Sequence, residues 1–104
     1  MTRATRVSSK NRIRLDFSIL VYREDAWWIA HCLEMDLPAE GNTPVEAVQN
    51  LLDLANLQVS TALDEGNLAS IFLPAPPELW RSFATAGLRR VTGFEHSRIR
   101  HGAK

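Results

Sequence analysis

The chain has 104 residues, 45% of them hydrophobic, and its twelve basic and twelve acidic residues balance to a formal net charge of zero. This length accommodates one domain with an apolar core and excludes two ordinary domains. The neutral total hides an uneven distribution, because residues 1–14 carry +5, residues 15–80 carry −10 and residues 81–104 carry +5. We therefore expect a basic N-terminal arm (1–14), one domain (15–87) and a basic C-terminal tail (88–104).

The chain contains one cysteine, Cys32, so no internal disulfide can form. No stretch approaches the roughly eighteen apolar residues of a membrane span, and the polar residues 1–10 lead into no apolar run of signal-peptide length. These features argue against a disulfide-stapled secreted domain and favour a cytoplasmic protein without membrane contact.

In residues 15–22, apolar side chains recur at every second position, which is typical of a half-buried strand. The side chains expected on the core side are Leu15, Phe17, Ile19 and Val21. After a short polar break, aromatic and β-branched side chains predict a second strand and therefore a hairpin.

A short third strand is predicted at residues 35–40, following the second strand at residues 26–33. Pro38 lacks a backbone N–H donor, which confines this strand to an edge or a bulge.

Residues 43–46 carry the strongest local signal, a capping box that starts a helix. Thr43 is the expected N-cap, Pro44 fits the first helical position and Glu46 completes the box. Apolar residues then recur at three- and four-residue steps over residues 44–63, widely enough to bury two faces of the helix. Gly66 is expected to end the helix in a left-handed conformation.

The remaining residues predict a further strand and a second helix. Residues 68–73 form the strand candidate, and residues 78–86 form a short helix that follows a proline-rich break and turns Leu79, Trp80 and Phe83 inward. Residues 88–104 show little periodicity and are expected to be a solvated tail. The predicted class is α+β with the order β-β-β-α-β-α, a small, mostly antiparallel sheet carrying one long helix.

This order, together with the sequence of residues 30–54, resembles the HicB antitoxin family. The shared pattern is an aromatic second strand, an acidic turn at residues 33–36, and a Gly-x-Thr-x-x-Glu-Ala segment followed by Asn-Leu. In this chain that segment consists of Gly41, Thr43, Glu46, Ala47, Asn50 and Leu51. The resemblance covers residues 15–73, and the ordered combination is more specific than any one of its parts.

The resemblance implies a partial ribonuclease-H-like fold without enzymatic activity. It also implies a prokaryotic toxin–antitoxin system, in which the antitoxin neutralises a small basic HicA-type toxin that cleaves mRNA. Many family members add a C-terminal DNA-binding segment. This chain departs from that pattern, because only one short helix and the tail follow Pro77.

Two enzymatic interpretations of the polar residues are weaker than structural ones. Asp16, Glu34, Asp36, Glu40 and Asp53 are the candidate ligands of a metal-dependent nuclease, but Asp16 alternates with core residues and should face away from them.

His31 and Cys32 invite a ligand or nucleophile interpretation, yet neighbouring strand residues point to opposite faces. We expect instead a half-exposed histidine beside a buried cysteine, with no metal and no cofactor.

Trp27 and Trp28 are adjacent in the second strand and must face opposite ways. Trp28 shares its side with Ala30 and Cys32, which places it toward the interior. Trp27 shares the other side with Ile29 and His31. Two alternatives stay open for it: Trp27 packs under the second helix or a tail, or it anchors an interface with a partner.

The sequence thus predicts a non-enzymatic, HicB-like interaction module that binds a HicA-type toxin. The expected partner-binding residues are Trp27, Glu34, Asp36 and Glu40. The apolar width of the long helix predicts a homo-oligomer, most simply a dimer. The alternative is an orphan homo-oligomeric regulator whose basic arms make weak contacts with nucleic acid.

Overall fold

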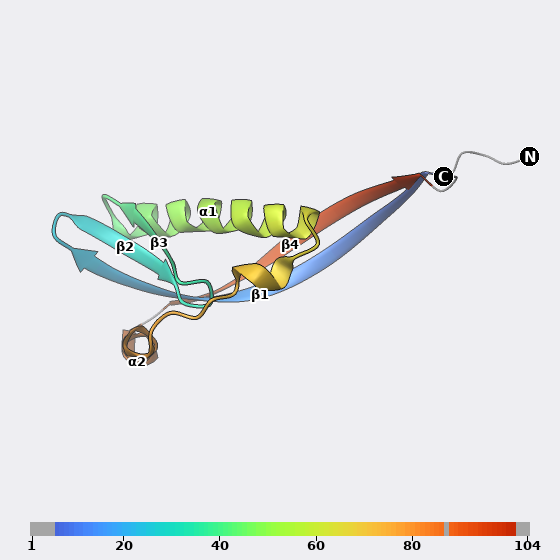
Figure 1. Cartoon of the computed structure of the whole chain (residues 1–104). Coiled ribbons are helices and arrows are strands. Elements are labelled where there is room, and N and C mark those ends of the chain that lie inside the picture. Colours follow the sequence, from blue (N-terminus) through green and yellow to red (C-terminus); the bar gives the residue numbers. More distant parts are fainter. Residues whose placement is uncertain (1–5, 87, 102–104) are drawn as a thin grey trace, which may run out of the picture.

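The computed structural model describes the backbone of residues 6–86 and 88–101 and the side chains of residues 14–86. Within these residues a four-stranded antiparallel sheet has the strand order β3-β2-β1-β4. The elements along the chain are β1 (Arg6–Glu24), β2 (Trp27–Cys32), β3 (Leu37–Gly41), α1 (Pro44–Asp64), a 3-10 helix η1 (Leu68–Ile71), α2 (Pro77–Ala86) and β4 (Leu88–His101). The predicted α+β class, with a small antiparallel sheet and one long helix, is confirmed (Figure 1).

β1 and β2 form the predicted hairpin, in which Glu24 pairs with Trp27 and Ile19 pairs with Cys32. Asp25, in the connecting turn, has a φ of 54°, a left-handed conformation that aspartate tolerates better than most residues. β3 lies at the edge of the sheet, as Pro38 predicts.

α1 covers one face of the sheet, and the two layers share the main apolar core (Figure 1). The core side of β1 contributes Phe17 and Ile19, and β2 contributes Ala30 and Cys32. The half-buried Trp28 packs against the same cluster, so the predicted core face of both strands is confirmed. The buried side chains of α1 are Ala47, Val48, Leu51, Ala55, Val59 and Ala62. Leu54 and Leu57 are exposed instead, so α1 buries one face rather than the two expected.

Both ends of α1 have the predicted caps. The backbone N–H of Glu46 donates to Oγ1 of Thr43 over 3.1 Å, and the Glu46 carboxylate accepts from the Asn42 N–H over 2.9 Å. At the other end, Gly66 has a φ of 68°, and the following N–H of Asn67 donates to the carbonyl oxygen of Ala62. This wrap-around bond satisfies a carbonyl that the last helical turn leaves without a partner.

Gly41 allows α1 to start directly against the edge strand. A Cβ atom at this position would collide with the backbone nitrogen of Ala47 and lie 2.8 Å from the Ala47 Cα. Because these are backbone atoms of the first helical turn, a side chain here would require the helix to move away from β3. The close approach of α1 to the sheet therefore requires glycine.

The predicted strand at residues 68–73 is wrong. Residues 68–71 form the single turn η1, with the Phe72 N–H donating to the carbonyl oxygen of Ala69. Leu68 and Ile71, three residues apart, both pack against the main core. A short apolar run of this kind fits either a strand or a helical turn, and here the packing position beside α1 selects the turn.

The expected solvated tail is also wrong for Leu88–His101, which form strand β4 and pair with β1. Without β4, the backbone N–H and C=O groups on the edge of β1 opposite β2 would have no strand to pair with, and β4 pairs with this edge. The predicted boundary between residues 14 and 15 likewise falls inside β1, which begins at Arg6. The polar residues 6–14 therefore continue the strand instead of forming a separate arm.

α2 lies on the opposite side of the sheet from α1 (Figure 1). Leu79, Trp80 and Phe83 pack against Leu20 and Leu33, which confirms the predicted inward face of this helix. The segment before α2 is fixed by two hydrogen bonds: the Ala75 N–H donates to the Leu33 carbonyl over 2.8 Å, and the Trp80 indole donates to the Ala75 carbonyl over 3.2 Å. None of the described helices is both long and apolar enough to cross a membrane.

Replacing the helix cap tests the local basis of α1. Thr43→Ala removes the acceptor for the Glu46 N–H, so we expect the free energy of unfolding to fall by about 0.5–2 kcal/mol in urea titrations. Thr61→Ala is the matched control, because Thr61 is exposed within the same helix and alanine is the better helix former there. An equal loss in both variants would contradict the capping assignment.

Candidate functional site

The sheet face turned away from α1 is only partly covered by α2. Tyr22, Ile29, His31 and Glu40 follow the same strand alternation and lie on the part of this face outside α2, which we call the open face. Ile29 and His31 are nevertheless buried, whereas Glu40 is exposed. The open face holds a shallow depression of about 490 Å³. Its lining contains two glutamates and no lysine or arginine, and consists of Tyr22, Glu24, Ile29, His31, Pro38, Ala39 and Glu40.

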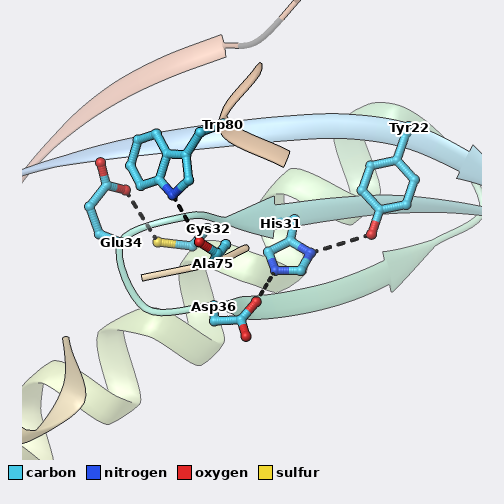
Figure 2. A network of polar contacts seen from close by, with 7 residues as sticks. All are labelled: Tyr22, His31, Cys32, Glu34, Asp36, Ala75 and Trp80. Carbon is cyan, nitrogen blue, oxygen red and sulfur yellow. Dashed lines mark hydrogen bonds and ion pairs between the residues drawn. The ribbon is translucent and has the colours of Figure 1, made fainter. Parts of the chain in front are cut away.

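A chain of three polar side chains lies along the open face (Figure 2). Nε2 of His31 is 2.7 Å from Oδ1 of Asp36, and Nδ1 of His31 is 3.3 Å from the Tyr22 hydroxyl. A carboxylate only accepts, so Nε2 donates to Asp36; in the tautomer with its proton on Nε2, Nδ1 accepts from the Tyr22 hydroxyl. Both ring nitrogens are occupied, and His31 is only 8% exposed. The expected half-exposed histidine is therefore wrong, since its two partners cover it.

The environment of Tyr22 shows the electrostatic character of the depression. Burial raises the pKa of the Tyr22 hydroxyl, and the negative charges of Glu24 and Asp36 raise this pKa further. A phenol in this setting stays protonated and keeps donating its hydrogen bond to His31. The depression thus combines the aromatic side chain of Tyr22 with surrounding negative charge, above the buried Ile29.

Asp36 and Glu40, two of the predicted partner-binding residues, are both exposed. Asp36 belongs to this network, and Glu40 lines the depression. Asp36 lies in the turn between β2 and β3 with a φ of 49°, and Glu40 pairs with Ile29 across the β2–β3 ladder. Trp27 lies at the other end of β2 and is 45% exposed, but it does not line the depression.

Glu34, the fourth predicted residue, has a structural role that the sequence did not reveal. The Ser18 N–H donates to Oε1 of Glu34 over 2.7 Å, and the Cys32 thiol donates to the same oxygen over 3.9 Å. After the Leu33 N–H has bonded to the Ser18 carbonyl, the chain turns away from β1. The Glu34 carboxylate therefore accepts the Ser18 N–H in place of a backbone carbonyl of the ladder. This role keeps the Glu34 side chain half-buried and away from Asp36 and Glu40.

Cys32 is buried on the α1 side, as predicted, and faces away from His31. Burial raises the pKa of its thiol from 9.0 to about 11, and the negative charge of Glu34 adds to the rise. A nucleophilic cysteine requires the opposite shift, because the thiolate is the reactive form.

The carboxylates considered as nuclease ligands are spread over the fold. Asp53 projects from the exposed side of α1, whereas Glu40 lies on the far side of the sheet. Among the residues described here, no group of three or more His, Cys, Asp or Glu side chains is placed to hold a metal ion.

Sequence reasoning missed Tyr22 and Glu24 and saw His31 only as a scaffold residue. The signal was present in the alternation, because Tyr22 and His31 both occupy positions opposite to the core side of their strands. Only the strand register shows that Tyr22 and His31 are diagonal neighbours. A comparison of the chain with known protein families, curated proteins and solved structures finds no match.

The structural role of Glu34 can be separated from a role of its charge. Glu34→Ala leaves the Ser18 N–H without its acceptor, and we expect it to lower the free energy of unfolding by about 1–3 kcal/mol. Glu34→Gln keeps an oxygen acceptor and should retain most of the stability in the same urea titration. Equal losses in the two variants would show that the negative charge, rather than the ladder hydrogen bond, stabilises this turn.

Proposed function

We propose that this chain is a HicB-like interaction module that binds and neutralises a small basic toxin of the HicA type in the cytoplasm. The observation that carries the proposal is the acidic depression on the open face, bordered by Glu24 and Glu40 and lacking lysine and arginine in its lining. A depression of this kind suits the basic side chains of a protein partner. The resemblance of residues 30–54 to the family supplies the class of that partner.

Two ranges of electrostatic interaction support binding of a basic protein. Residues 15–80 carry a net charge of −10, and residues 15–92, which include Arg89 and Arg90 paired with β1, carry −7. This charge attracts a basic protein and speeds its encounter. At short range, the half-buried Tyr22 offers an aromatic surface on which an arginine guanidinium group can stack. Long-range attraction and local fit are separate contributions and can be tested separately.

In this proposal the chain acts by covering the toxin surface, without a chemical step and without a cofactor. Asp36 and Glu40 contribute charge, and Trp27 contributes an exposed aromatic anchor at the hairpin end of the same face. Tyr22 and Glu24 join the proposed contact surface. Glu34 supports this surface indirectly, by fixing the turn that carries Asp36.

Reversing the charge of the depression tests the site. In Glu24→Lys/Glu40→Lys, we expect the affinity for a purified HicA-type toxin to fall at least tenfold in 50 mM salt, because two attractive charges become repulsive. The loss should shrink as salt rises, since charges are screened beyond roughly 10 Å at 0.1 M. Titration calorimetry gives the affinity, and growth on co-expression with the toxin shows whether neutralisation is lost.

The matched control is Asp53→Lys/Glu65→Lys, which changes the net charge equally at exposed positions away from the open face. We expect this variant to slow association while leaving most of the affinity and the growth rescue intact. Equal effects of the two double variants would reject the depression as the binding site. Failure of the unmodified chain to bind the toxin would reject the proposed function.

Self-association through α1 is the second part of the proposal. Leu57 is 63% exposed and Leu54 is 37% exposed on α1, outside the face that packs on the sheet. An apolar strip of this kind is typical of an interface between copies. We expect light scattering at micromolar concentration to give a dimer, and Leu54→Lys/Leu57→Lys to give a monomer. A monomeric unmodified chain would contradict the expectation.

A further inference from the structure

β1 and β4 join the two basic ends of the chain into one structural element. Their register runs from Ile19 opposite Leu88 to Arg6 opposite His101, whereas β2 pairs with β1 only between Ile19 and Glu24. Residues 6–14 and 93–101 therefore form a two-stranded ribbon, which projects beyond α1 (Figure 1). With a rise of about 3.4 Å per residue, its nine residue pairs extend roughly 30 Å.

The ribbon has the opposite charge to the rest of the chain. Its two strands contain one acidic residue, Glu95, and six basic residues, which are Arg6, Lys10, Arg12, Arg14, Arg98 and Arg100. These charges come from opposite ends of the sequence and meet only through the pairing of β1 with β4. The result is a net charge of +5 on a narrow projection attached to an acidic body.

In the β1–β4 register of the ribbon, no lysine or arginine pairs directly with another lysine or arginine. Lys10 pairs with Ser97, Arg98 with Ser9, and Arg100 with Val7. Arg12 pairs with Glu95 and Arg14 with Gly93. Like charges at directly opposed positions destabilise a strand pair, so this register concentrates positive charge while avoiding the strongest local repulsion.

We propose that this ribbon binds duplex DNA, with its basic residues contacting the phosphate backbone. A two-stranded β-ribbon fits the major groove of B-form DNA, which is roughly 12 Å wide, whereas the major groove of A-form RNA is deep and narrow. The acidic body disfavours DNA elsewhere on the molecule, which confines contact to the projecting ribbon. This site is separate from the depression on the open face, and the inference does not rest on the proposed function.

The test measures binding of the full chain to a fluorescent 20-base-pair DNA duplex by anisotropy. Strand alternation places Arg6, Lys10, Arg12 and Arg14 on one face of the ribbon, and Arg98 and Arg100 on the other. If the four residues on the first face contact phosphates, raising the salt from 50 to 200 mM should weaken binding about a hundredfold. A duplex RNA of the same sequence should bind more weakly. Absence of salt-sensitive DNA binding would overturn the proposal, and equal binding of the RNA would overturn the assignment to the DNA groove.

Substitutions then locate the site on the ribbon. Lys10→Thr/Arg12→Thr/Arg14→Thr removes three charges from one face of the ribbon while keeping residues that favour strands, and should weaken DNA binding at least tenfold in 50 mM salt. The matched variant Lys10→Arg/Arg12→Lys/Arg14→Lys keeps the charge and should bind within threefold of the unmodified chain. Arg23→Thr/Arg81→Thr, which changes exposed cations outside the ribbon, should leave DNA binding unchanged.

Circular dichroism establishes whether each variant keeps the fold. A folded threonine variant that binds DNA like the unmodified chain would overturn the proposal. If the threonine variant unfolds, the salt series and the charge-keeping variant decide the outcome, because both use folded protein. Salt-sensitive self-association without DNA binding would show that the ribbon instead contacts the acidic body of a second copy, and would also overturn the proposal.

Discussion

The close contact between α1 and one face of the sheet determines the rest of this structure. Ala47 and Ala55 belong to the same buried cluster as Phe17 and Ile19, and Gly41 lets the first turn of the helix start against the backbone of β3. Each large apolar side chain removed from water in this layer contributes about 1.5–3 kcal/mol. Once α1 has taken this face, every alternate residue of β1 and β2 must turn to the other face.

That second face is divided between packing and exposure. α2 covers Leu20 and Leu33 and is held there by the backbone bond between Ala75 and Leu33. The neighbouring part remains open, and its polar groups satisfy one another through the chain from Tyr22 to His31 to Asp36. These hydrogen bonds hold the three side chains in place, and such preorganisation lowers the entropic cost of the binding proposed for this face.

Charge is separated in space as well as along the sequence. The body carries the acidic residues of the depression, and the paired ends of the chain carry basic residues on a ribbon that projects from it. Surfaces of opposite charge attract different partners. The basic protein proposed for the open face and the DNA proposed for the ribbon therefore have separate sites and need not compete. The zero net charge of the whole chain therefore says little about what it binds.

The sequence by itself determined the features that depend on neighbouring residues. The alternation of residues 15–22, the capping box at Thr43 and the left-handed end at Gly66 are local, because each depends on backbone geometry within a few positions. Tertiary structure alone decided which distant groups meet. Ser18 finds the Glu34 carboxylate where β2 leaves the ladder, and residues 6–14 find residues 93–101, which have no periodicity of their own to predict a strand. Such pairings depend on strand register and on unfilled backbone hydrogen bonds, and a local sequence pattern specifies neither.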